Sequence, residues 1–164
     1  MRYTQAIQQK IFHLDALKAI RAGWKMRSKT VAFTNGCFDI LHEGHISSLS
    51  KAAEAADYLI VGVNSDASTK RLKGNDRPVN NEQSRALLLA SLIMVDAVII
   101  FEEDTPLQLI EALMPDVLVK GGDYTIETIV GAKEVMANGG KVLINPIIEG
   151  FSTTGILQKI RQLG

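Results

Sequence analysis

The stretch Val31-Ala32-Phe33-Thr34-Asn35-Gly36-Cys37-Phe38-Asp39-Ile40-Leu41-His42-Glu43-Gly44-His45-Ile46 passes from an apolar run through a polar, glycine-containing turn to a pair of histidines. Its first four residues are typical of a buried strand, and Ile46 opens an apolar stripe with helical spacing. The histidines therefore fall where a strand is followed by a helix. A helix start offers unpaired backbone N–H groups and the positive end of the helix dipole, so the sequence predicts a polyphosphate site here.

Four other segments resemble this first strand. They are short and rich in Val, Ile and Leu, and they are apolar at odd and even positions alike. With the first, they span residues 30–34, 58–63, 96–101, 116–120 and 141–144. Strands of this kind are typical of a parallel sheet covered on both faces. Helical stripes lie between them, one formed by Ile46, Leu49, Ala52, Ala53 and Ala56 and another by Ala86, Leu88, Leu89, Leu92 and Val95. The alternation predicts an α/β fold with a central parallel sheet.

The remaining segments suggest how the chain is divided. Apolar residues from Ile7 to Ile20 are spaced for one added helix over residues 5–27. We therefore expect a helical extension, residues 1–27, and a main domain, residues 28–164. Thr105-Pro106 predicts a helix start, Gly139-Gly140 predicts a stop before the last strand, and residues 64–83 predict one long polar connection.

Composition limits the classes of partner. The 164 residues carry 18 basic and 18 acidic side chains, so no overall field gathers nucleic acid or a membrane surface. The single cysteine cannot form an internal disulfide, no signal segment follows Met1, and no apolar run approaches the roughly 20 residues needed to span a bilayer. We expect a cytoplasmic protein that binds small molecules, with no nucleic acid and no membrane partner.

Polar clusters follow four of the predicted strands, where open α/β sheets bind their ligands. The clusters are Asn35 to His45, Asn64-Ser65-Asp66, Lys120-Gly121-Gly122-Asp123 and Gly150-Phe151-Ser152-Thr153-Thr154. The last one opens a helix, so its hydroxyl and N–H groups can offer a second phosphate surface. Three basic residues lie in or after the long connection, namely Lys73, Arg77 and Arg85, and their side chains are candidates for binding a phosphorylated substrate.

Each cluster also has a simpler interpretation. His42 and His45 can be structural histidines, or zinc ligands with Cys37 or Asp39, although no second ligand pair of zinc-site spacing is present. The Ser-Thr-Thr cluster can be a helix cap, the Gly121-Gly122 pair a loop, and the three basic residues solvated surface charges. Neither a Walker A motif nor a G-x-G-x-x-G motif at a helix start occurs.

Taken together, these residues resemble the HxGH nucleotidyltransferases of the cytidylyltransferase-like group, over almost the whole chain. The strings that carry the resemblance are Thr34 to His45, Val63-Asn64-Ser65-Asp66, Leu72-Lys73-Gly74, Arg77-Pro78-Val79, Phe101-Glu102-Glu103-Asp104-Thr105-Pro106 and Val119-Lys120-Gly121-Gly122-Asp123-Tyr124. Within the group they are most similar to the heptose-1-phosphate adenylyltransferase domain of ADP-heptose synthesis, in a stand-alone form. The resemblance implies a Rossmann-like three-layer sandwich and a homodimer.

The implied reaction transfers AMP from ATP to a heptose 1-phosphate and releases pyrophosphate, with Mg²⁺ accompanying the phosphates. By resemblance, the triphosphate is bound by His42, His45, Ser152, Thr153 and Thr154. The nucleotide is contacted by Asn35, Gly36, Cys37, Phe38, Asp39 and Gly44, and its adenine and ribose by Lys120, Gly121, Gly122 and Asp123. The heptose phosphate is bound by Asn64, Asp66, Lys73, Arg77 and Arg85. No metal ligand and no histidine charge state follow from the sequence.

Two other functions remain open at this point. One is a related transferase that uses CTP or another phosphorylated acceptor such as glycerol 3-phosphate. The other is a nucleotide-binding regulatory subunit without activity, because a fold alone does not establish catalysis.

Overall fold

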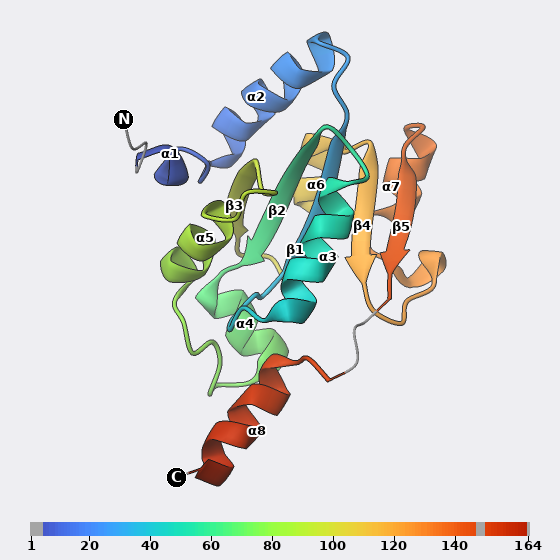
Figure 1. Cartoon of the computed structure of the whole chain (residues 1–164). Coiled ribbons are helices and arrows are strands. Elements are labelled where there is room, and N and C mark those ends of the chain that lie inside the picture. Colours follow the sequence, from blue (N-terminus) through green and yellow to red (C-terminus); the bar gives the residue numbers. More distant parts are fainter. Residues whose placement is uncertain (1–4, 147–149, 164) are drawn as a thin grey trace.

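The computed structural model describes residues 5–146 and 150–163, in which a five-stranded parallel sheet carries helices on both faces (Figure 1). The strand order is β3-β2-β1-β4-β5, with β1 Val31–Gly36, β2 Tyr58–Asn64, β3 Ala97–Phe101, β4 Val117–Gly121 and β5 Lys141–Asn145. Every neighbouring pair is parallel. All five strands lie where the sequence predicts them, with ends that agree to within two residues.

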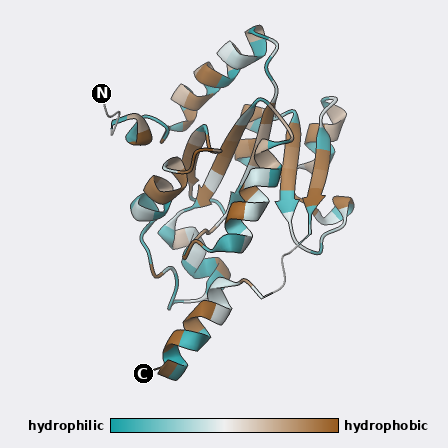
Figure 2. Cartoon of the chain, in the orientation of Figure 1, coloured by the Kyte–Doolittle hydropathy of each residue, from teal (hydrophilic) through white to brown (hydrophobic). Residues whose placement is uncertain are grey.

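Two separate buried clusters define the layers. Ala32, Leu59 and Val61 pack on one face with helices α3 (Glu43–Ala53) and α5 (Glu82–Ala90). Phe33 and Ile60, their neighbours along the strands, pack on the other face with α2 (Leu14–Met26), α6 (Leu107–Leu113) and α7 (Ala132–Ala137). Successive strand residues point to opposite faces, so strands that are apolar on both parities need both layers. The expected three-layer sandwich is confirmed, and the hydropathy colouring shows its apolar strands between the helices (Figure 2).

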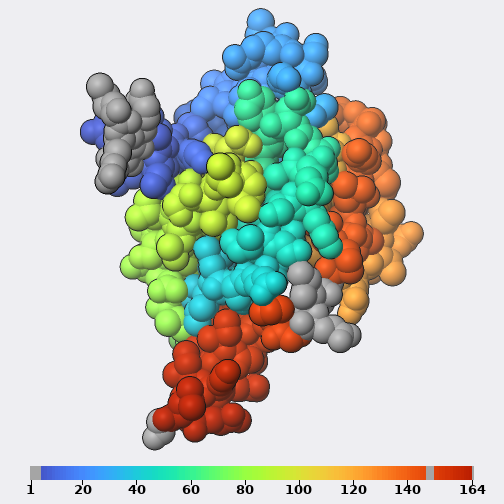
Figure 3. All heavy atoms as spheres, in the orientation of Figure 1, coloured from blue at the N-terminus to red at the C-terminus, as the bar shows by residue number. Residues whose placement is uncertain are grey.

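The remaining elements are α1 (Gln5–Gln8), α4 (Asp66–Lys73), the 3₁₀ helix η1 (Ile126–Thr128) and α8 (Thr153–Leu163). Helix α8 extends away from the sheet and contains no buried residue (Figures 1 and 3). Within residues 5–146 and 150–163, no helix combines the length and apolar character that crossing a membrane requires.

The N-terminal segment is not the single helix that its spacing predicts. Helix α1 ends at Gln8, and Ile11 then pairs in parallel with Val98 on the outer edge of β3. The Phe12 N–H donates to the Val98 carbonyl at 2.9 Å, and the Val98 N–H donates to the Lys10 carbonyl at 2.8 Å. Because an exposed strand edge leaves backbone groups unpaired, these bonds favour an extended segment over a continuous helix.

Two other details differ from the sequence predictions. The polar connection over residues 64–83 contains α4, whose N-cap Ser65 accepts a hydrogen bond from the Ser68 N–H at 3.1 Å. The α6 helix begins at Leu107 with Pro106 as its N-cap, one residue later than Thr105-Pro106 suggested. In α5, the predicted apolar stripe is shifted, because Leu88 is exposed whereas Arg85, Ala86 and Leu89 are buried.

A pair of glycine substitutions tests the packing around β2. A Cβ on Gly62 would lie 3.0 Å from the Phe33 ring and 3.3 Å from the Phe101 ring, so we expect Gly62→Ala to lower the free energy of unfolding by about 1–3 kcal/mol. In α2, a Cβ on Gly23 meets nothing closer than 4.0 Å, and Gly23→Ala is expected to raise it by about 0.5–1 kcal/mol. Urea denaturation measures both, and equal effects of the same sign would contradict this packing.

Candidate active site

The loops that follow the strands meet at the carboxyl edge of the sheet. Strand β1 lies at the centre, and the chain connects it to β2 on one side while β4 pairs with it on the other. The position between β1 and β4 is the topological switch point, where adjacent loops diverge and leave a crevice. A pocket of about 360 Å³ opens there. The predicted convergence of strand ends is therefore seen in the structure for β1, β2 and β4.

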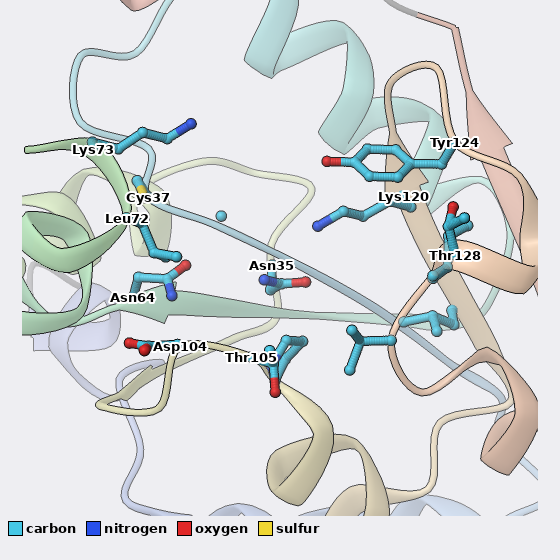
Figure 4. Close-up of a pocket in the computed structure, with 15 residues that line it drawn as sticks. Asn35, Cys37, Asn64, Leu72, Lys73, Asp104, Thr105, Lys120, Tyr124 and Thr128 are labelled. Atoms are coloured by element: carbon cyan, nitrogen blue, oxygen red, sulfur yellow. The ribbon is translucent and has the colours of Figure 1, made fainter.

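Six of the residues singled out from the sequence line this pocket: Asn35, Gly36, Cys37, Asn64, Lys73 and Lys120. Figure 4 shows the ammonium groups of Lys73 and Lys120 entering it from opposite walls. The pocket also includes residues to which the sequence assigned no role in the site, some of which lie within the resemblance strings: Leu72, Asp104, Thr105, Pro106, Leu118, Tyr124, Thr128, Ile129 and Val130. Most of these follow β3 or β4, so extending the strand-end rule to every loop would have found them.

Lys120 is the main electrostatic feature of the pocket. Its burial lowers the pKa of the ammonium, Cys37 opposes this shift, and the nearby charge of Lys73 lowers the pKa further. In the described part of the chain, neither Lys73 nor Lys120 forms a salt bridge. Lys73 is exposed, whereas Lys120 is largely buried. Two ammonium groups without a carboxylate partner favour an anionic ligand, because its charge offsets the desolvation of Lys120 and the repulsion between the two lysines.

The two histidines lie at the start of α3, as the sequence predicts. His42 is the N-cap residue, and its side chain makes no capping bond, so the first turn keeps N–H groups for an external acceptor. The imidazole rings of His42 and His45 stack with their centroids 3.8 Å apart. A Cβ on Gly44 would lie 3.1 Å from the His42 ring and 3.2 Å from the Cβ of Phe151, so glycine lets this turn close tightly.

The histidine charge state, which the sequence left open, follows from burial. Burial lowers the pKa of His42, and burial together with the charge of His42 lowers the pKa of His45 to about 4. Both rings are therefore neutral at neutral pH. Each Nδ1 is buried and has no hydrogen-bond partner among the described residues. The proton is better placed on Nε2, where it can be donated to a ligand.

Asp39 organises the loop between α4 and α5. Its buried carboxylate accepts hydrogen bonds from Arg77 Nε at 2.6 Å, the Val79 N–H at 2.8 Å and the Asn80 N–H at 2.9 Å. Burial acts to raise the pKa of Asp39, but these three donors outweigh it and hold the pKa below its ordinary value. Asp39 and the Nε of Arg77 are thus engaged with each other, whereas the sequence predicted ligand contacts for both.

Arg85 is also placed differently from the expectation that it meets a sugar phosphate. Its side chain is fully buried. The guanidinium donates to the Cys37 carbonyl, to the Asn80 carbonyl at 3.0 Å and to the Asp66 carboxylate at 2.8 Å. Asp66, another expected substrate ligand, is therefore its ion-pair partner. Arg85 connects the turn that follows β1 and the first residue of α4 with the loop that precedes α5.

The Ser152-Thr153-Thr154 cluster begins a helix, as predicted. The Ser152 hydroxyl accepts the Gly155 N–H at 2.9 Å, which is the capping interaction kept open as the simpler alternative. The Thr153 hydroxyl lies 3.4 Å from the Ile40 carbonyl, which places the start of α8 beside the segment that leads into α3. Two helix starts therefore lie near each other, and the Thr154 side chain is exposed.

The loop after β4 carries the last predicted cluster. Gly121 ends the strand, and Gly122 has a φ of +131°, a conformation that L side chains rarely adopt. Asp123 follows outside the pocket lining. No group of three or more His, Cys, Asp or Glu side chains in residues 5–146 and 150–163 could hold a metal ion, and the zinc alternative finds no support there.

An open parallel sheet with an anion-attracting pocket at its switch point and uncapped N–H groups beside it is the architecture of an α/β nucleotide-binding protein. Comparison with known proteins narrows this class. The cytidylyltransferase-like family model matches residues 33–159. The chain belongs to the cytidylyltransferase-like family, which makes it a nucleotidyltransferase.

Curated relatives agree with this assignment. A bifunctional protein HldE from Mesorhizobium japonicum is 57% identical over 150 residues, which are 90% of this chain and 30% of that protein. A bifunctional protein HldE from a Caulobacter species is 56% identical over 151 residues, which are 92% of this chain and 31% of that protein. This chain thus spans about a third of the length of these relatives.

Solved structures show the same fold. The lipopolysaccharide core biosynthesis protein from Thermoplasma volcanium superposes with a TM-score of 0.59 and 31% identity, over 73% of this chain and 97% of that one. A pantoate-beta-alanine ligase from Francisella tularensis, solved with beta-gamma ATP and beta-alanine, superposes with a TM-score of 0.60 and 16% identity. The match covers 92% of this chain and 76% of the ligase chain. At that identity the second likeness concerns the fold alone.

Removing the Arg85 guanidinium tests its role as a connector of loops. Arg85→Met leaves the Asp66 carboxylate and two carbonyl groups without their donor, and we expect the free energy of unfolding to fall by about 3–5 kcal/mol. The matched control is Arg71→Met, because Arg71 and Asp104 form an exposed pair whose loss should cost about 1 kcal/mol or less. Chemical denaturation compares the two, and similar small losses would contradict the connecting role.

The depressed pKa of His45 predicts a pH dependence of stability. Between its ordinary value of 6.5 and its folded value of about 4, the unfolded chain binds more protons, so stability falls as the pH is lowered through this range. Allowing for partial solvent exposure, we expect His45 to account for about 1–2 kcal/mol of the loss between pH 7 and pH 5. Unfolding measured at both pH values should show a smaller loss for His45→Gln, and an equal loss would refute a buried neutral imidazole.

Proposed function

We propose that this chain transfers AMP from ATP to D-glycero-D-manno-heptose 1-phosphate, giving ADP-heptose and pyrophosphate for lipopolysaccharide or another heptose-containing glycan. The motif strings from Thr34 to Tyr124 support this reaction through their resemblance to the heptose-1-phosphate adenylyltransferase domain. The identity to the HldE proteins and the likeness to a lipopolysaccharide core biosynthesis protein also support it.

One structural observation carries the proposal, namely that the Gly36 to Asp39 turn has an anion-attracting surface on each side. The lysine pocket includes Gly36 and Cys37, and the histidine pair follows the turn at the start of α3, with Phe38 5.3 Å from the His45 ring. Transfer between two phosphorylated molecules needs two such places in close proximity. A pure binding protein needs only one.

The chemistry requires alignment more than proton transfer. An oxygen of the heptose phosphate forms a bond to the α-phosphorus of ATP, the bond from that phosphorus to the bridging oxygen breaks, and pyrophosphate leaves with the electron pair. The attacking phosphate is already anionic, so no general base is needed. The protein's contribution is to hold two anions in line and to stabilise the charge that develops on the leaving group.

The residues divide between the two sides of the turn. We place the triphosphate against the α3 start, where neutral His42 and His45 donate Nε2–H groups, with the Ser-Thr-Thr helix start beside them. We place the heptose phosphate in the pocket between Lys73 and Lys120, which moves Lys120 from the adenine edge expected from the resemblance. Asn35 and Asn64 then face the sugar hydroxyls, and the backbone of Gly121 and Gly122 keeps its proposed place near the base.

Mg²⁺ belongs to the proposal as the counterion of ATP. The carboxylate of Asp39 is occupied by three donors, and the described residues offer no acidic cluster to cage the ion. Magnesium commonly keeps its waters and binds phosphate oxygens, so ATP itself supplies suitable ligands. A homodimer, implied by the resemblance, remains a prediction that sedimentation analysis of the purified chain can check.

The deciding experiment measures pyrophosphate release with ATP or CTP, each offered with α- or β-heptose 1-phosphate or glycerol 3-phosphate, in the presence of Mg²⁺. Selective turnover of ATP with one heptose phosphate is the expected result and identifies the anomer. Turnover confined to CTP or to glycerol 3-phosphate would support the related transferase instead. Tight ATP binding without any turnover would support the regulatory subunit.

The histidine pair provides a sharper test in the same assay. His45→Ala removes one donor to the developing charge and is expected to lower kcat by about 10²–10³, with His42→Ala in the same range. His13, the N-cap residue of α2 on a different helix, is the matched control, and His13→Ala should keep wild-type turnover. Wild-type kcat in a folded His45→Ala variant would remove the histidines from the mechanism.

A further inference from the structure

Tyr124 forms part of the pocket wall but has no role in the reaction described so far. It lies in the loop between β4 and η1, and 45% of its surface is exposed. Figure 4 shows its hydroxyl directed into the pocket above the ammonium of Lys120. Among the described residues, the hydroxyl has no hydrogen-bond partner, so a polar donor faces the cavity and is available to a ligand.

Two contacts hold the ring in this position. The Lys120 ammonium lies 5.4 Å from the ring centroid, within the range of a cation–π interaction. The ring also lies against Gly122, where a Cβ would come within 2.8 Å of Cε2. Gly122 thus leaves room for the ring, and the ring in turn faces the lysine. The phenol and the ammonium are therefore presented to the pocket as a pair.

We propose that Tyr124 is a binding residue for the phosphate group of the acceptor, to which its hydroxyl donates a hydrogen bond beside the Lys120 ammonium. The inference rests on the proposed function for the identity of the acceptor. A bound phosphate offers several acceptor oxygens and can take both donors at once. The neutral phenol adds direction to the attraction of the ammonium, and Lys73 approaches the same anion from the opposite wall.

The phenol can be tested separately from the ring. Tyr124→Phe keeps the ring, its contact with Gly122 and its face toward Lys120, and removes only the hydroxyl. Because a hydrogen bond to a charged group is lost in the ground state and the transition state alike, we expect KM for the acceptor to rise about 10-fold or more with kcat nearly unchanged. Tyr58→Phe is the matched control, since Tyr58 stacks on Trp24 with centroids 4.2 Å apart, outside the pocket lining.

A double-mutant cycle shows whether the two groups share one phosphate. Tyr124→Phe and Lys120→Met are measured singly and together, with KM for ATP followed in parallel. If both donors contact the same phosphate, the combined rise in acceptor KM should differ from the product of the single effects, and KM for ATP should stay within about 2-fold. Independent effects that multiply, or an acceptor KM for Tyr124→Phe equal to that of Tyr58→Phe, would overturn the proposal.

A binding measurement keeps this test separate from the proposed function. If no heptose phosphate is turned over, the proposed function fails, and calorimetric titration of the wild-type and Tyr124→Phe proteins with inorganic phosphate decides the inference. Weaker phosphate binding to Tyr124→Phe, by about 10-fold, supports the donor role. Equal affinity for the two proteins, or no phosphate binding to the wild type, overturns it.

Discussion

The buried guanidinium of Arg85 is the constraint on which the carboxyl edge of this sheet depends. A fully buried guanidinium is tolerated only when its N–H groups find acceptors. Here the N–H groups of Arg85 donate to the Cys37 and Asn80 carbonyls and to the Asp66 carboxylate. These acceptors belong to the turn after β1, the loop before α5 and the start of α4, which the strands alone would leave independent. Asp39 binds the backbone of Val79 and Asn80 from the other side. One network of two buried charges therefore positions Cys37, which lines the pocket, and the segment that leads into α3.

That network explains why the charged groups of the site divide into two kinds. Arg85, Asp66, Asp39 and the Nε of Arg77 are paired within the protein and serve its geometry. Lys73 and Lys120 have no carboxylate partner in the described residues and remain available to a ligand. The two histidines are uncharged. Their imidazole rings stack with centroids 3.8 Å apart at a partly buried helix start, where the neutral form is more stable than the protonated one. In the proposed reaction, the lysines would therefore attract one anion by their charge, and the neutral histidines would donate hydrogen bonds to the other.

The sequence predicts the sheet well because each strand is apolar on both parities, which only a doubly covered parallel sheet satisfies. It also predicts that Asn35, Asn64 and Lys120 share one edge, since parallel strands bring their carboxyl ends together, and it places Lys73 in the connection that follows the second of these strands. It does not predict the role of Arg85, because arginine is usually exposed and two of its three acceptors are backbone carbonyls, which carry no sequence signal. The extended segment at Ile11 escapes prediction for a similar reason, since its partner is a strand edge some ninety residues away. The hydrophobic pattern of the sequence predicts which segments are buried and where strands end. Hydrogen bonds between segments that are distant in the chain are seen only in the three-dimensional fold.

Phe38 shows how one strained residue joins the two sides of the site. Its φ of +48° lies in the left-handed region, which costs a non-glycine residue of the order of 1 kcal/mol, and the side chain is nevertheless buried. The ring lies 5.3 Å from the His45 ring and so near Gly36 that a Cβ there would come within 3.1 Å. Gly36 and Cys37 line the lysine pocket, whereas His45 belongs to the α3 start. The tight turn therefore connects the lysine pocket and the α3 start directly along the chain. In the proposed reaction, two phosphates that repel each other in water would be held on the two sides of this turn. The Arg85 hydrogen bond to the Cys37 carbonyl and the Asp39 hydrogen bonds to Val79 and Asn80 flank Phe38 and offset the strain there.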